Sequence, residues 1–226
     1  MVAALSSTMR EYLAEIYRLG DRESQPDGFV STSALADLLD VSAPAVNRMV
    51  IKLRDQGLLQ HEPYQGIRLT EMGEREALKQ LRRHRIVEAF LTNVMGFGWH
   101  EIHEEADRIS PTLTDMVVDR MAEMAGNPTR CPHGEPIPSP DGEIPELHDM
   151  LIPDAPQDVM LEITRVRTRE PDRLEYMAAL ELLPGTRLQI VHAAPFNGPI
   201  QLRLRDKEFR IIGHNLAEMI RVQMVE

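Results

Sequence analysis

Two histidine–carboxylate pairs are the first residues whose types and spacing could do chemistry. His84 and Glu88 stand four residues apart, and so do His103 and Asp107. Residues four apart share one face of a helix, so each pair could present an imidazole and a carboxylate together. Divalent transition metals prefer such donors. One pair alone is more often a surface pair, whereas two pairs on consecutive segments favour a metal site.

A cysteine and a further histidine add donors of the same kind. Cys131 and His133 flank a proline, where an extended backbone could aim both side chains at one point. Glu11, on the first predicted helix, is another candidate. A single buried cysteine is usually a packing residue, but its neighbouring histidine favours a ligand pair. Because Cys131 is the only cysteine, no internal disulfide can form, which is typical of the reducing cytosol.

A metal-dependent hydrolase is the enzymatic alternative. The run from His100 to His103 resembles the zinc protease motif, but that motif places its second histidine four residues after the first. Here that position holds Glu104. The sequence also lacks a serine–histidine–aspartate arrangement, a phosphate-binding loop and a dinucleotide fingerprint. We therefore predict that the protein is not an enzyme.

A second group of residues predicts a helix-turn-helix. Thr32 or Ser33 can cap a short helix that ends at Leu39. Ser42 can cap a second helix, with Pro44 in its first turn, where a missing N–H costs little. Two short helices joined by a tight turn form a helix-turn-helix. The hairpin that the next residues predict would be the wing of a winged helix.

The second of these helices is the candidate DNA-reading element. It carries basic residues and no acid before Asp55, and Arg68 adds a charge from the wing. Basic side chains neutralise phosphates, and the first residues of a recognition helix read bases in the major groove. The alternative is a winged helix that contacts only protein, or a solvated charged face. The candidate DNA-binding residues are Thr32, Ser33, Ser42, Pro44, Ala45, Asn47, Arg48, Lys52 and Arg68.

The net charge and the apolar content of the chain limit where it could bind DNA and where in the cell it could lie. Its 226 residues carry a net charge of −11, so DNA binding would need a local basic face. We find no signal peptide and no apolar run of ~20 residues. The chain is therefore expected to be soluble, cytoplasmic and independent of membranes.

The composition of the sequence changes at a segment from 127 to 158, which holds eight of the 16 prolines. Before it the periodicity is helical, and after it strands and an Asn197-Gly198 hairpin signal predominate. The predicted helices are Ser7–Leu19, Glu71–Met95, His100–Ile109, Thr114–Ala125 and Leu174–Leu182, and the predicted strands are Met160–Val166, Arg187–Val191, Ile200–Leu204 and Glu208–Ile212.

These elements predict an α+β protein of four parts. A winged helix-turn-helix DNA-binding domain occupies residues 1–73, and a helical domain that carries candidate metal ligands occupies residues 74–133. A proline-rich linker covers residues 134–158. Short strands around turns rich in glycine and proline then suggest a small β-barrel at residues 159–226.

Six motifs spread along nearly the full length carry a likeness to a known family: REYLAEIY, VSTSALADLLDVSAPAVNRMVIKL, EPYQGIRLTEMG, RRHRIVEAFL, WHEIHEEADR and CPHGEPIP. With these motifs the chain resembles the diphtheria toxin repressor family of metal-dependent regulators, especially the manganese-responsive members with a C-terminal Src-homology-3-like domain. The resemblance implies that residues 74–133 are a dimerisation and metal-binding domain. It also implies a homodimer that binds palindromic operator DNA when loaded with Mn(II) or Fe(II), and that represses metal-uptake genes. The alternative is a winged-helix regulator not controlled by metal.

The resemblance also implies two metal sites, which this chain matches unequally. One maps to Glu11 and Asp107, whose hard oxygen donors suit Mn(II). Ser110 and Pro111 stand where the family continues with glutamate and histidine, so that site is depleted. The better-preserved site maps to His84, Glu88, His103, Cys131 and His133, with Glu170, and after it Asp172, as the acid from the barrel.

Overall fold

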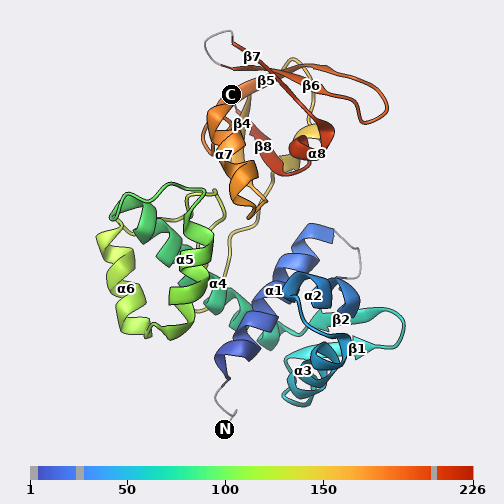
Figure 1. The fold of residues 1–226 in the computed structure, drawn as a ribbon, viewed down its shortest axis with the longest axis vertical. Helices are drawn as coiled ribbons and strands as arrows, with labels where there is room; N and C mark the ends of the chain where they lie inside the picture. The colour runs from blue at the N-terminus through green and yellow to red at the C-terminus, as the bar shows by residue number, and fades with distance from the viewer. Residues whose placement is uncertain (1–4, 24–27, 205–207, 226) are drawn as a thin grey trace. The chain divides into compact units, whose positions relative to one another are not determined.

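The computed structural model describes residues 5–23, 28–204 and 208–225, which form two compact units. The first unit comprises Met1–His84 and Pro138–Ile144, and the second comprises Arg85–Ile137 and Pro145–Glu226. The boundary falls inside the long helix α4 (Glu71–Asn93) (Figure 1). Each unit therefore has its own core.

The first unit packs three helices against a two-stranded hairpin. Its apolar core joins residues from all three helices and from the hairpin, including Leu13, Leu35 and Ile67. The order of two short helices followed by a hairpin confirms the predicted winged helix-turn-helix. The elements are α1 (Ser7–Glu23), α2 (Thr32–Leu39), α3 (Ala43–Asp55), β1 (Leu59–Glu62) and β2 (Gly66–Leu69).

A cap and a close backbone approach fix this unit locally. The cap of α2 is Ser31, whose hydroxyl accepts from the amide of Ser33 at 3.2 Å. The predicted caps, Thr32 and Ser33, lie one and two residues too late, because three consecutive hydroxyl residues offer the same chemistry. At the hairpin, a Cβ on Gly66 would lie 2.3 Å from the carbonyl oxygen of Val30. Only glycine lets the two backbones come so close.

The long helix α4 contributes to the cores of both units. Thr70 caps it, since its hydroxyl oxygen accepts from the amide of Gly73 at 3.2 Å. Its first half buries Leu78 and Leu81 in the first unit. Its second half packs with two further helices in the second unit. Those helices are α5 (Ile102–Ile109), which continues into the 3-10 turn η1 (Ser110–Thr112), and α6 (Asp115–Met124).

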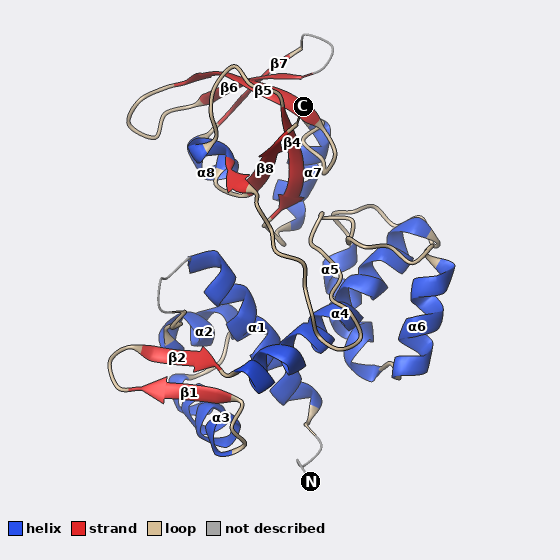
Figure 2. Ribbon diagram, turned by 180° about the vertical axis from the view of Figure 1, so that it is seen from behind, coloured by secondary structure: helices blue, strands red, loops and turns tan. Residues whose placement is uncertain are grey.

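The second unit also contains a six-stranded antiparallel sheet in the order β3-β8-β4-β5-β6-β7. Figure 2 labels its strands β4 to β8. The Asn197-Gly198 signal is confirmed, because this dipeptide lies in the turn that joins β5 to β6. Pairing between the described strands leaves β3 and β7 as edges. The strands are β3 (Met150–Leu151), β4 (Leu161–Val166), β5 (Arg187–Ala193), β6 (Ile200–Leu204), β7 (Phe209–Ile212) and β8 (Ile220–Met224).

Short helices complete this part of the chain. They are the 3-10 turn η2 (Ile152–Asp154), α7 (Pro171–Ala179) and α8 (His214–Ala217). The predicted helix began at Leu174, three residues after the observed start of α7, since a proline such as Pro171 is well tolerated in the first turn of a helix. The prediction from sequence lacked β3, α8 and β8. Among the described residues, every helix is too short or too polar to serve as a transmembrane span.

Candidate metal centre and nucleic-acid interface

Five of the predicted metal ligands gather in one cluster, which we call the donor cluster. His84, Glu88 and His103 form one group of possible ligands, and Glu88, Cys131 and His133 form another. Within each group the ligand atoms lie within 4.8 Å of one another. Glu88 belongs to both groups. Four of the five residues are buried, and His103 is partly buried.

Helical spacing and one tight turn bring these donors together. His84 and Glu88 lie one turn apart on α4, and His103 lies on α5. The other two donors lie on a turn of four residues, 131–134, which we call the ligand turn. It is closed by a hydrogen bond from the amide of Gly134 to the carbonyl of Cys131, at 2.8 Å. The sequence pattern thus predicted both the helical pair and the pairing of Cys131 with His133.

A backbone carbonyl orients the ring of His133. Its Nε2 lies 2.7 Å from the carbonyl oxygen of Trp99 and donates to it, because a carbonyl can only accept. In the neutral ring, Nδ1 then carries the lone pair, and it lies 3.9 Å from Oε1 of Glu88. A lone pair and a carboxylate that face each other favour a cation between them. Metal-ligating histidines are commonly oriented by such outer hydrogen bonds.

The charge balance of the donor cluster points the same way. Glu88 is only 1% exposed, and its Oε1 lies 2.7 Å from Nδ1 of His103. Burial, followed by the nearby carboxylate of Glu88, raises the pKa of the Cys131 thiol well above its usual range. A positive charge stabilises a buried carboxylate. A divalent ion would supply that charge and would also favour the thiolate.

The donor set fits a first-row divalent metal. Imidazole and carboxylate suit Mn(II) and Fe(II), and a thiolate adds a softer donor. The remaining predicted ligands lie outside the two donor groups. Asp107 accepts from Nη2 of Arg169 through both carboxylate oxygens, at 2.8 Å each. Glu170 pairs with Arg173 at 2.7 Å, and its side chain is 62% exposed.

The residues of the depleted site do not fit a second ion. Ser110 is buried at the end of α5, and Pro111 lies in the turn η1. Neither side chain offers a carboxylate or an imidazole, and the carboxylate of Asp107 is held by an arginine. Glu11 is exposed on α1, in the first unit.

The predicted DNA-reading face lies on α3 and the wing. The first turns of α3 expose Pro44, Asn47 and Arg48, and Lys52 is exposed further along the helix. Ser42, which directly precedes the helix, is exposed as well. Ala45 and Thr32 are partly buried, Ser33 is exposed, and exposed Arg68 lies over the ring of Phe29, 4.9 Å from its centroid.

Several residues around these sites were not predicted. Tyr64 stands fully exposed at the turn of the wing. Trp99 orients a ligand through its backbone, and a backbone contact has no sequence signal. Arg169 reaches Asp107 across 62 residues of sequence. His100 precedes α5, which begins at Ile102, so the hydrolase-like histidines do not share a helix.

Three family models match successive parts of the chain. Residues 4–67 match the N-terminal DNA binding domain of iron dependent repressors, and residues 70–139 match their metal binding and dimerisation domain. Residues 150–224 match the FeoA domain. The matched parts together span most of the chain.

Individual relatives agree with these models. The iron-dependent repressor IdeR of Mycobacterium tuberculosis is 26% identical over 233 residues, which cover 98% of this chain and 99% of that protein. The solved structure of a manganese-dependent transcriptional repressor in complex with manganese is 30% identical. It has a TM-score of 0.85 and covers 96% of this chain and 99% of that one. The chain therefore belongs to the iron-dependent repressor family, to which the diphtheria toxin repressor also belongs.

Proposed function

We propose that this protein is a transcriptional repressor that binds operator DNA when Mn(II) or Fe(II) is bound, and that it controls metal uptake and homeostasis. The observation that carries the proposal is the donor cluster, in which a buried carboxylate, three imidazoles and a thiol converge. The same chain carries an exposed basic helix in a winged helix-turn-helix. Metal sensing and DNA binding are thus both built into one polypeptide.

The proposed ligands are His84, Glu88, His103, Cys131 and His133. A bound divalent ion would be held by imidazole, carboxylate and thiolate donors from two helices and the ligand turn. Because α4 carries His84 and Glu88 and begins directly after the wing, the ligands share a helix with the DNA-binding unit. Metal binding need only favour the DNA-competent state to act as a switch.

We propose that α3 enters the major groove as the recognition helix. Asn47 and Arg48 are suited to bidentate contacts with adenine and guanine. Lys52 and Arg68 would neutralise phosphates. Members of a dimer place two such helices about one DNA turn apart, so a palindromic operator is expected.

We propose a homodimer formed through the helical part of the second unit. The helix α6 leaves Met116, Val117 and Met124 exposed, and apolar exposure of this kind is typical of an interface. The matching family model is that of a dimerisation domain. Light scattering of the purified chain should give twice the mass of one chain.

We also propose that the C-terminal sheet closes into a small barrel. Two β-bulges, in β4 and β5, bend the C-terminal sheet and favour closure into a small barrel. The FeoA match agrees with a Src-homology-3-like domain. The domain limits 1–73, 74–133, 134–158 and 159–226 stay predictions. A repressor that acts on DNA has a binding role, so we propose a cytoplasmic protein that is not an enzyme.

The central test measures DNA binding with and without metal. A random-sequence duplex library would be selected on the full-length protein in Mn(II), and the selected duplex would then be titrated in Mn(II) and in chelator. We expect binding about tenfold or more tighter with Mn(II). Equal affinity would instead support the alternative, a winged-helix regulator not controlled by metal.

A matched pair of histidine variants links the switch to the donor cluster. His84→Ala removes a buried donor, whereas His100→Ala removes a histidine outside both groups. Loss of the Mn(II) response in the first variant alone would support the assigned site. An unchanged response in His84→Ala would refute it.

A further inference from the structure

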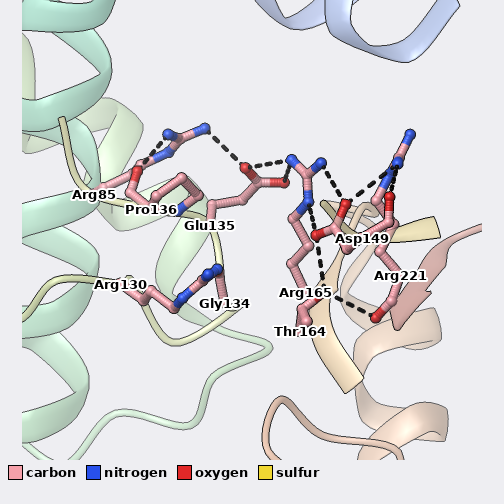
Figure 3. Close-up of polar contacts among 9 residues, drawn as sticks. All are labelled: Arg85, Arg130, Gly134, Glu135, Pro136, Asp149, Thr164, Arg165 and Arg221. Atoms are coloured by element: carbon pink, nitrogen blue, oxygen red, sulfur yellow. Dashed lines mark hydrogen bonds and ion pairs between the residues drawn. The ribbon is translucent and has the colours of Figure 1, made fainter. Parts of the chain in front are cut away.

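An ion-pair network joins the neighbourhood of the ligand turn to the C-terminal sheet (Figure 3). All of it lies within the second unit. Glu135 comes two residues after His133, whereas Arg165 belongs to β4 and Arg221 to β8. The network consists of Arg85, Glu135, Asp149, Arg165 and Arg221.

Arg165 is the centre of the network. Its Nε and Nη2 donate to the two carboxylate oxygens of Asp149, at 2.8 and 3.0 Å. Its Nη1 donates to Oε2 of Glu135 at 3.2 Å. The side chain of Arg165 is only 4% exposed, so solvent and salt screen these pairs weakly. One guanidinium therefore holds two carboxylates from different segments in a fixed arrangement.

Arginines from two other elements complete the network. Arg85, the neighbour of His84 on α4, donates to Oε2 of Glu135 at 3.2 Å and to the carbonyl of Pro136 at 2.6 Å. Arg221 donates to Oδ1 of Asp149 at 3.3 Å. The carboxylate of Glu135 is thus held from both sides, by the metal-binding helix and by the sheet.

The backbone of the ligand turn is also seated directly on β4. The amide of Val166 donates to the carbonyl of His133 at 2.9 Å. A Cβ on Gly134 would lie only 2.0 Å from the carbonyl oxygen of Thr164. The proposed ligands Cys131 and His133 therefore stand on a turn whose backbone and following side chain are both fixed by the sheet.

We propose that Glu135 and Arg165 are positioning residues of the metal centre, through which the C-terminal sheet holds the ligand turn in its ligating arrangement. They act through the turn and not on the metal itself. This inference rests on the proposed metal-binding function and deepens it, because it gives the sheet a part in metal affinity. The converse also follows: metal binding favours the seated state of the turn on the sheet.

The test is the Mn(II) affinity of the full-length protein, measured by isothermal titration. Glu135→Gln is the mildest variant, since Arg165 keeps Asp149 and Arg85 keeps the Pro136 carbonyl. We expect about tenfold weaker Mn(II) binding, the lower end of the loss that follows when residues that orient metal ligands are replaced. Arg165→Gln should act in the same direction.

The double variant and a matched control separate positioning from general stability. If the two residues act as one unit, Glu135→Gln combined with Arg165→Gln should bind no more weakly than the weaker single variant. The control is Arg187→Gln, which removes the ion pair of Arg187 with Glu162 at 3.4 Å. Glu162 lies on β4, the strand that also carries Arg165. It should leave Mn(II) affinity unchanged.

Two results would overturn the inference: wild-type Mn(II) affinity in Glu135→Gln, or an equal loss in Arg187→Gln. Should Arg165→Gln fail to fold, the comparison of Glu135→Gln with Arg187→Gln decides alone. Failure of the proposed function looks different, because the wild-type protein itself would then bind no Mn(II).

Discussion

Glu88 is the residue that unites the donor cluster. Its carboxylate belongs to both groups of ligands and is almost fully withdrawn from solvent. It is the one carboxylate among the five proposed ligands, so Glu88 supplies the carboxylate charge of the donor cluster. A buried charge of this kind is tolerated when a cation faces it.

The thiol of Cys131 makes metal binding depend on pH. Burial and then Glu88 raise its pKa, so the metal-free protein holds a neutral thiol at neutral pH. The thiol must lose its proton before its sulfur can bind the metal as a thiolate. Mn(II) affinity should therefore rise between about pH 6 and about pH 8, with proton release on binding. Titrations in buffers of different ionisation enthalpy would measure the released protons. Cys131→Ser should release fewer, and an unchanged number would exclude the thiolate as a ligand.

At the scale of elements, one turn and one helix perform the two proposed tasks. The ligand turn holds two donors in four residues and is seated on β4. The helix α3 presents its polar and basic residues outward while Val46, Val50 and Leu53 anchor it in the core. Each element is thus fixed on one side by packing or hydrogen bonds, and carries the residues of its proposed task on the other.

Gly134 offers a test of how closely the turn must approach the sheet. Both Gly134 and Gly126 have φ +84°, but only a Cβ on Gly134 would meet backbone atoms. Alanine at either position should cost about 1 kcal/mol of backbone strain. Gly134→Ala should in addition lower Mn(II) affinity about tenfold, because the ligands move with the turn. Thermal unfolding and metal titration of both variants would check this, and equal affinities would contradict it.

Asp149 should make the second unit sensitive to acid. Burial alone would raise its pKa, but the hydrogen bond and charge of Arg165, with Thr164 and Arg221, outweigh burial and lower the pKa. The contribution to stability is therefore complete above the unfolded value, about pH 3.9, and is lost as pH falls through the lower folded value. Urea unfolding should show Asp149→Asn destabilised by about 3 kcal/mol at neutral pH, with a flatter decline in acid. Asp154→Asn, at an exposed position, is the control.

The basic side chains of α3 should set the salt dependence of DNA binding. Lys52→Ala should reduce the slope of log affinity against log salt by about 1 without changing sequence preference. Asn47→Ala should relax sequence preference instead. Binding assays over a range of salt would measure both, with Lys79→Ala on α4 as the control. A slope unchanged by Lys52→Ala would remove that residue from the phosphate contacts.

Local signals made most helices and the central strands predictable from sequence. Thr70 marks the start of α4, and Pro44 that of α3. The strand β8 escaped prediction because its residues follow a helix-like run without a turn signal. The spacing of four on a helix is a local rule, and it predicted the pair of His84 with Glu88. The same rule paired His103 with Asp107, which lies outside the donor cluster because its carboxylate accepts from Arg169. The pair of Glu135 with Arg165 was not predictable, because it joins residues 30 apart whose meeting depends on the tertiary fold.

At the scale of the whole molecule, the charge distribution matters more than its sum. The chain is acidic overall, with a net charge of −11, while the exposed face of α3 carries basic side chains. An acidic protein repels the DNA backbone at a distance, so non-specific binding should be weak. Specific binding then depends on the local face and on the proposed metal switch.

A prediction of metal content follows from the donor cluster, the one proposed site whose residues fit an ion in the part of the chain that the structure describes. Arg169 already holds the carboxylate of Asp107, and Ser110 and Pro111 offer no ligand for a second ion. We expect one Mn(II) per chain, measured by elemental analysis of the dialysed protein. Asp107→Asn should keep this ratio, whereas Glu88→Gln should reduce it towards zero. Two ions per chain would contradict the assignment.

The placement of Cys131 and His133 on a turn has a consequence for how this sensor could diversify. Glu88 and His103 are set in helices whose other residues build the core, so exchanging them disturbs the architecture. The turn lies between elements, and its side chains can vary while its backbone stays seated on β4. Substitutions in the ligand turn alone could therefore change the metal preference, while the proposed DNA-binding residues stay the same.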